Sequence, residues 1–271
     1  MSADNSGPLV VAVDGSDRNR AALSWAAAEA ADREGDLVVV RAVPDAGRAD
    51  PALLAEVAAQ LETVLPRERV QTAVPVGRPE DVLCAEDSDA AMVVVGKRGM
   101  SALPRILVGS TSLAVAARSP VPVVVVPDGW DPPTEDVRPL SVGVDPDHAH
   151  DLVLETAFRR AERLGVPLVA VHGWEPPSSP AAPAEVAALE RGSHDRFAGV
   201  VDAWEKRFST VEVRRVASDQ HPAVAVLDAA DAQLLVLGRR RQSGFSGFGF
   251  GSVTRAVLHY ASCPVLVVPA D

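Results

Sequence analysis

Glycines, serines and basic residues gather in the stretch 96–110, which reads GKRGMSALPRILVGS. The stretch follows the apolar run 92–95 and precedes residues that favour a helix over 110–118, so its glycines lie between a buried strand and a helix. Glycine lets the backbone take positive φ and approach a sugar or phosphate closely. The free N–H groups and positive dipole end of a helix attract an anion, and the Ser110 hydroxyl adds a donor. This combination indicates phosphate binding, although a lone Gly-x-x-Gly also fits ordinary turn glycines.

The second half of the chain repeats this pattern. Four pairs align without a gap: Gly96 with Gly238, Arg98 with Arg240, Gly109-Ser110 with Gly251-Ser252, and Pro122-Val123 with Pro264-Val265. Closer to the start of each half, Asp14 in VAVDGS aligns with Asp145 in VGVDPD. The chain is therefore a tandem duplication of a unit of about 130 to 140 residues, the size of one domain.

Apolar strands alternate with helices in both halves. We expect strands at 9–13, 37–43, 69–76, 91–95 and 121–126, and helices at 17–33, 51–65, 79–86 and 110–118. In the second half we expect strands at 140–144, 166–171, 211–216, 233–237 and 265–268, and helices at 149–164, 185–208, 223–230 and 253–260. Such alternation predicts parallel sheets covered by helices on both faces.

Two proline-rich segments interrupt the pattern. Residues 127–139 (PDGWDPPTEDVRP) are proline-rich and acidic, which is typical of a linker between domains. Residues 175–184 (EPPSSPAAPA) indicate a low-complexity insertion in the second half. We therefore expect domains at 1–130 and 137–271.

Together these motifs resemble the universal stress protein family. The features are a strand ending in V-x-V-D, a second strand seen here as VVVRA and VAVHG, then V-V-G-x-x-G-x9-G-S, and a closing strand P-V-x-V-V-P. They occur in this order in both halves and cover nearly the whole chain. The resemblance implies α/β architecture with two Rossmann-like (adenine nucleotide α-hydrolase-like) domains, each with a five-stranded parallel sheet of order 3-2-1-4-5. Strands 1 and 4 would then be neighbours whose connections leave on opposite faces, and a ligand crevice opens there.

The resemblance also implies a set of ATP-binding residues. In the first half these are Asp14 for the nucleotide, the Ala42 backbone for adenine, Gly96 and Gly99 for ribose and phosphates, and Gly109, Ser110 and Thr111 for phosphate. The matching residues of the second half are Asp145, Gly173, Gly238, Arg241, Gly251, Ser252 and Val253. Taken alone, Asp14 would equally fit a turn or a helix N-cap.

Arg241 is the point at which the second half departs from the motif, because it replaces the second loop glycine. A residue with a β-carbon cannot adopt the same backbone conformation at low cost, and its side chain would fill the ribose space. Alternatively, its guanidinium could bind a phosphate. We favour the steric interpretation, which predicts weaker nucleotide binding in the second half.

The amino-acid composition indicates which binding partners and which cellular compartment to expect for this protein. The net charge of −11 and the pI near 5.0 argue against a surface for nucleic acid or acidic lipid. Cys84 and Cys263 lie in different halves and fit small core residues in a reducing compartment. The sequence starts with a polar stretch and has no window of about 18 apolar residues, so we expect a cytoplasmic protein without a membrane segment.

The histidines do not form a convincing metal site. His148 and His150 would point about 200° apart on a helix, so we expect a solvated helix start there, and a structural role for His172. Neither half shows a nucleophile with an adjacent base that recurs in the other, so we expect no metal and at most slow ATP hydrolysis.

Two functions are consistent with these observations. The first is an ATP-binding stress-response regulator, with or without Mg²⁺, whose nucleotide state alters contacts with a protein partner. The second is a nucleotide-independent scaffold in which one or both sites are vestigial. In either case the closing strands 121–126 and 265–268 would be sheet edges, and pairing between them would give an intramolecular pseudo-dimer. Further assembly into a homodimer is left open.

Overall fold

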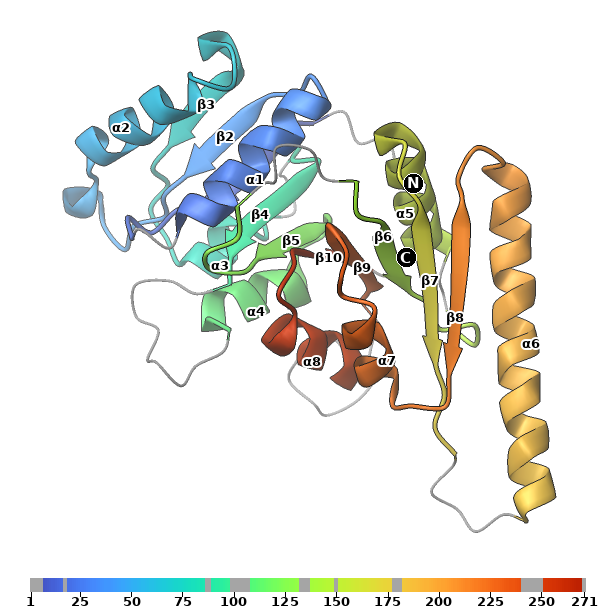
Figure 1. Cartoon of the computed structure of the whole chain (residues 1–271). Coiled ribbons are helices and arrows are strands. Elements are labelled where there is room, and N and C mark those ends of the chain that lie inside the picture. The colour runs from blue at the N-terminus through green and yellow to red at the C-terminus, as the bar shows by residue number, and fades with distance from the viewer. Residues whose placement is uncertain are drawn as a thin grey trace. The chain divides into compact units, whose positions relative to one another are not determined.

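The computed structural model describes residues 7–16, 19–85, 89–97, 108–131, 137–148, 151–176, 182–239 and 251–269. These residues divide into two compact units, one before residue 132 and one after residue 136 (Figure 1). Each unit consists of a parallel sheet and its helices, so the predicted α/β architecture with two tandem domains is confirmed.

The sheet of the first domain has five parallel strands. They are β1 (Leu9–Ala12), β2 (Leu37–Val40), β3 (Val70–Ala73), β4 (Met92–Gly96) and β5 (Val123–Val126). Pairing runs in the order β3-β2-β1-β4-β5, as the family resemblance implies. β4 and β5 are almost entirely buried, which explains their unbroken apolar sequences.

Helices of the first domain pack closely on this sheet. They are α1 (Asn19–Asp32), α2 (Pro51–Leu61), α3 (Pro79–Val82) and α4 (Ser110–Arg118), with short 3₁₀ turns η1 (Ala46–Arg48) and η2 (Arg67–Arg69). Alanines and Trp25 form the buried face of α1, and their small size lets the helix approach the strands. Arg69 donates hydrogen bonds to the carbonyls of Ala30 (2.8 Å) and Gly35 (2.7 Å) and so stabilises the end of α1.

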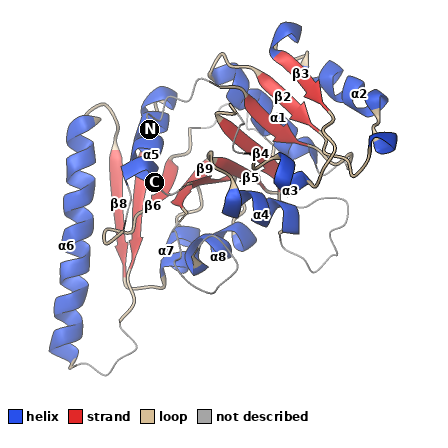
Figure 2. Cartoon of the chain, turned by 180° about the vertical axis from the view of Figure 1, so that it is seen from behind, coloured by secondary structure: helices blue, strands red, loops and turns tan. Residues whose placement is uncertain are grey.

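The second domain repeats the architecture. Its strands are β6 (Leu140–Gly143), β7 (Leu168–Gly173), β8 (Val213–Ser218), β9 (Leu234–Gly238) and β10 (Val265–Val268), paired in the order β8-β7-β6-β9-β10. Its helices are α5 (Asp151–Leu164), α6 (Pro183–Arg207), α7 (Pro222–Asp228) and α8 (Ser252–Tyr260). α6 runs beside β8 and extends past it (Figures 1 and 2).

An aromatic cluster joins α5 to α6. Phe158 is fully buried. The centroid of its ring lies 5.9 Å from the ring centroid of Trp204 and 5.4 Å from that of Phe208. The Arg207 guanidinium covers the Trp204 ring at 4.1 Å. The cluster holds the long helix against the core of its domain.

Several elements are shorter than the sequence predicts. β3 ends at Ala73, three residues before the expected end, because Pro75 cannot donate to a strand partner. α2 ends at Leu61 instead of residue 65, ahead of Pro66. Conversely, β7 continues to Gly173, two residues beyond the expected end. The predicted pairing between the closing strands of the two domains stays a prediction.

We expect Phe158→Ala to destabilise the second domain by about 3–5 kcal/mol, since truncation leaves a cavity beneath Trp204 and Phe208. Tyr260→Ala is the control: Tyr260 is 67% exposed, and its loss should change stability by less than about 0.5 kcal/mol. Urea unfolding followed by circular dichroism measures both. Equal destabilisation by the two variants would contradict the assigned core.

Candidate functional site

The carboxyl ends of β1 and β4 bring the first-domain site residues together. These strands pair directly, with Val11 opposite Val94, and the same register places Val13 at the level of Gly96. Asp14 therefore follows β1 at the edge where Gly96 ends β4. The strand order makes this position the topological switch point of the sheet, as expected from the family resemblance.

Asp14 organises the turn that leads into α1. Its Oδ1 accepts hydrogen bonds from the Ser16 amide (3.0 Å), the Ser16 hydroxyl (2.7 Å) and the Asn19 side-chain amide (2.7 Å). Gly15 between them has φ +85°, a conformation that favours glycine. The turn role that the sequence left open for Asp14 is thus present, and it holds the carboxylate at the sheet edge.

The glycine segment is tied to the start of α4. The Gly96 carbonyl accepts a hydrogen bond from the Ser112 hydroxyl (2.6 Å), and the Gly109 amide donates to the Lys97 carbonyl (2.8 Å). Gly96 ends a strand, and it is not among the described glycines with positive φ. Gly96 therefore does not use the positive φ that glycine permits, because the strand continues through it, and its proposed approach to a ligand stays a prediction. Gly99 lies outside the described residues.

The start of α4 offers backbone donors. Gly109 is the N-cap, with φ −67° and no side-chain cap, and the first two helical residues are Ser110 and Thr111. Amides in a first helical turn have no acceptor within the helix, and the helix dipole adds positive potential. Since Ser112 joins this turn to Gly96, the donors lie at the same edge as Asp14.

The second domain reproduces this framework. Gly238 ends β9, and its carbonyl accepts from the Thr254 hydroxyl (3.2 Å), as Gly96 does from Ser112. α8 starts at Ser252 and Val253 behind the N-cap Gly251, which has φ −70° and no side-chain cap. The matched hydroxyls of Ser112 and Thr254 were not predicted as site residues, although their equivalent places in the repeat could have revealed them. Arg241 lies outside the described residues.

The strand-end aspartate has different partners in the second domain. Asp145 Oδ1 accepts from the Asp147 amide (3.2 Å), and its Oδ2 lies 3.0 Å from His148 Nδ1. Arg196 of α6 donates from Nε and Nη2 to the two oxygens of Asp147 at 2.7 and 3.1 Å, which raises the pKa of the guanidinium. This loop is thus held by α6, and Asp145 is engaged by a side chain that has no counterpart in the first domain.

Gly173 and Ala42 match in the repeat but have different surroundings. A β-carbon on Gly173 would lie 2.5 Å from the Pro222 Cα and 2.9 Å from the Gln220 carbonyl oxygen. Glycine is therefore required there by the approach of the α7 backbone. Ala42 follows β2 and carries a β-carbon, so the two predicted adenine positions are not equivalent.

His172 is a buried structural residue. Its Nδ1 lies 3.1 Å from the Val144 carbonyl, which can only accept, and its Nε2 lies 2.9 Å from the Ser193 hydroxyl. Its ring also stacks on Phe197 at 5.3 Å. Burial lowers the pKa of His172, so the imidazole is neutral at pH 7. This residue joins β6, β7 and α6 beneath the strand-end loop.

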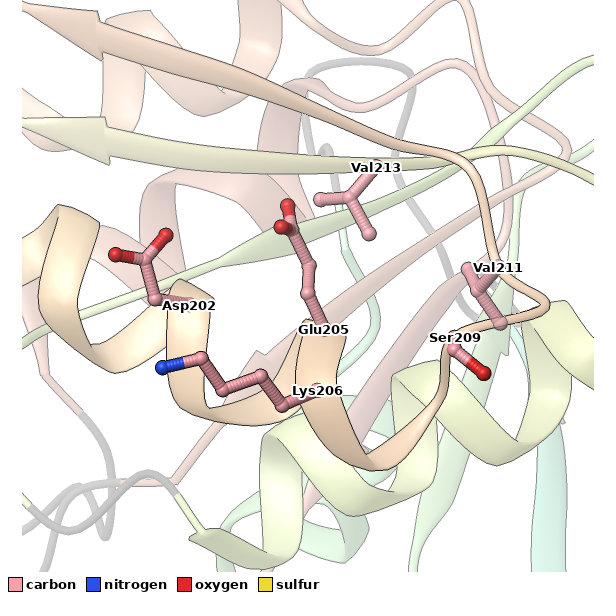
Figure 3. A pocket seen from close by; sticks show the side chains of 6 residues that line it. All are labelled: Asp202, Glu205, Lys206, Ser209, Val211 and Val213. Atoms are coloured by element: carbon pink, nitrogen blue, oxygen red, sulfur yellow. The ribbon is translucent and has the colours of Figure 1, made fainter.

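A shallow hollow beside α6 lies elsewhere in the second domain. Its lining residues are Asp202, Glu205, Lys206, Ser209, Val211 and Val213 (Figure 3). Arg215 pairs with both Asp202 and Glu205 at 2.6 Å, and the hydrogen bond to Glu205 raises the pKa of the arginine. The carboxylates of Asp202 and Glu205 are therefore paired within the protein. Across the described ranges, no three His, Cys, Asp or Glu side chains are placed to hold a metal ion.

We expect His172 to make the second domain less stable as pH falls. The unfolded histidine protonates near pH 6.5, whereas the folded one resists protonation, so stability is complete above about pH 6.5 and decreases below it. His194, Asp145 and Asp147 are the titratable groups that face the ring. His172→Gln cannot titrate, and it should lose less stability than the wild type between pH 6.5 and 5. Equal losses in urea unfolding would contradict this prediction.

Comparison with known proteins identifies relatives along the whole chain. The sequence profile of the universal stress protein family matches residues 6–127 and again 137–269. A universal stress protein of Mycolicibacterium smegmatis is 34% identical over 289 residues, which covers 96% of each chain. One from Mycobacterium tuberculosis strain H37Rv is 32% identical over 282 residues, again with 96% coverage of each chain.

A solved structure that covers nearly the whole chain agrees on the fold. A universal stress protein from Archaeoglobus fulgidus aligns with a TM-score of 0.62 at 20% identity, covering 98% of this chain and 97% of that one. Another universal stress protein, solved in complex with cAMP, is 30% identical over 44% of this chain and 94% of its own, with a TM-score of 0.38. None of the described helices combines the length and hydropathy needed to cross a bilayer. With both halves matched by the family profile, the chain belongs to the universal stress protein family.

Proposed function

We propose that the first domain binds an adenine nucleotide, ATP, at the carboxyl ends of β1 and β4. The observation that carries the proposal is the uncapped start of α4, which Ser112 fastens to Gly96 beside the Asp14 turn. Phosphates at Gly109, Ser110 and Thr111 would meet backbone donors and the positive end of the helix dipole. Asp14 would then face the nucleoside.

In this proposal, bound ATP acts as a regulatory signal in a stress response and changes contacts with a protein partner. Hydrolysis is at most slow. The chemistry required of the site is binding, for which helix-start amides and one carboxylate suffice.

The second domain supports a different role, as a nucleotide-independent interaction module. Asp145 is engaged by His148, and Arg196 fixes the adjacent Asp147 to α6. A ligand that used Asp145 would have to compete with the His148 contact. Asp14 also has protein partners, Ser16 and Asn19, so the asymmetry rests on Arg241, which replaces the second loop glycine of the motif. We expect unequal sites within one chain, with the second site weaker or vestigial.

Gly109→Val should lower ATP affinity at least about 100-fold, or about 2.7 kcal/mol, because a branched side chain would occupy the approach to the α4 amides. The fold should persist, since φ −67° suits any residue. Gly251→Val is the matched control: a β-carbon there meets no atom within 4 Å, and the variant should change only binding to the second domain. Isothermal titration calorimetry gives affinity and stoichiometry. Unchanged affinity in folded Gly109→Val would overturn the site.

Arg241→Gly should strengthen nucleotide binding by the second domain about 5-fold to 150-fold, if the arginine imposes a backbone penalty of about 1–3 kcal/mol. Stoichiometry at moderate ATP concentration would then rise towards two per chain. Weaker binding in this variant would instead identify Arg241 as a phosphate ligand. Two equivalent nucleotides in the wild type would refute the asymmetry.

A further inference from the structure

Arg41 brings a cation to the edge of the first-domain site. It follows β2 directly, and its amide donates to the Ala73 carbonyl (3.0 Å). Its side chain is only 19% exposed, and Nη2 lies 3.9 Å from the place of a β-carbon on Gly15. Because Gly15 follows Asp14, the guanidinium borders the turn that holds the site carboxylate.

The hydrogen-bonding capacity of Arg41 is not filled by the protein. Nη1 is buried and has no hydrogen-bond partner. Its nearest carboxylate, Asp50, lies 3.8 Å away, and the other oxygen of Asp50 caps α2 by accepting from the Leu53 amide (3.2 Å). A buried donor without an acceptor costs stability, so such a group at a site edge is suited to a ligand that supplies acceptors and negative charge.

The second domain provides an internal comparison. His172 occupies the position of Arg41, yet both of its ring nitrogens have protein partners, Val144 and Ser193. The imidazole is neutral, whereas a guanidinium is always charged. The two domains therefore differ at this position: one has a neutral ring with two protein partners, and the other has a cation with a buried donor that lacks an acceptor.

Sheet order determines which part of a nucleotide Arg41 would meet. The phosphate donors of α4 follow β4, whereas Arg41 follows β2, with β1 between them. Adjacent strands are about 4.8 Å apart, so these two positions are separated by about 10 Å across the sheet. This separation is similar to the length of a nucleoside. A nucleotide with its 5′-phosphates at α4 and its sugar over Asp14 would bring the ribose beside Arg41, because Arg41 Nη2 borders Gly15, the residue after Asp14.

We propose that Arg41 strengthens the binding of an adenine nucleotide to the first domain when its ribose carries a second phosphate, at the 2′ or 3′ oxygen. The proposal rests on the proposed function of the same site. A phosphate offers a guanidinium paired acceptors together with the opposite charge, whereas a ribose hydroxyl or a neutral base offers no charge. In dinucleotide-binding folds, an arginine near the ribose accommodates a 2′-phosphate through the same chemistry.

The test compares AMP with adenosine 2′,5′-bisphosphate and adenosine 3′,5′-bisphosphate by calorimetry at one ionic strength. The full-length chain carries Gly251→Val throughout, so that the first site is measured alone. We expect one bisphosphate to bind at least about 10-fold more tightly than AMP, or about 1.4 kcal/mol. Arg41→His, which installs the residue of the second domain, should reduce this ratio to near one and change AMP affinity by less than about 3-fold.

Arg48→Ala is the matched control. It removes an equal charge nearby, from a side chain that is 74% exposed, and should preserve the ratio. Equal binding of AMP and both bisphosphates, an equal loss of all three ligands in Arg41→His, or tighter binding of GMP than of the bisphosphates would overturn the proposal. Thermal unfolding confirms that each variant is folded. Failure of ATP and AMP to bind at all would instead refute the proposed function.

Discussion

Direct pairing of β1 with β4 is the constraint on which the candidate site depends. These strands are far apart in the sequence, yet their register places the Asp14 turn and the Gly96 segment at one edge. This strand order makes the edge the topological switch point of the sheet, where open α/β sheets typically bind their ligands. The hydroxyl of Ser112 then fixes the start of α4 to this edge. This arrangement of backbone and small side chains supports the proposed binding role.

Local sequence predicts most elements of the fold because their signals are local. Residues 110–118 and 265–268 form the predicted helix and strand with unchanged bounds. Element ends are less predictable, as β3 and β7 show, since they depend on the partners of individual amides. Long-range contacts leave even less local signal. Arg69 stabilises the end of α1 from across the domain, and no spacing near Arg69 indicates this.

The residues of the candidate site were predictable to about the same extent as the elements of the fold. Repetition and resemblance identified Asp14 and Gly109, because both halves retain these types at matched positions. Sequence could not distinguish a glycine kept for ligand approach from one kept for packing. Gly173 shows the difference, since its missing β-carbon accommodates the backbone at Pro222. For a related reason, the strand before the glycine segment ends at Gly96, one residue beyond the expected end, because the motif fixes the residue type but not the point at which a strand ends.

A comparison of the two duplicated domains distinguishes the features that the fold requires from the features that belong to each site. Both domains retain the strand order, the uncapped helix start and the hydroxyl that fastens it, so these features support the common framework. The strand-end surroundings have diverged. In the second domain His172, Asp145 and Asp147 have partners from the protein, which stabilise that edge without a ligand. In the first domain Arg41 keeps a buried donor without an acceptor. Asp14 of the first domain also has protein partners, Ser16 and Asn19, so the two strand-end edges differ most clearly at the position of Arg41 and His172.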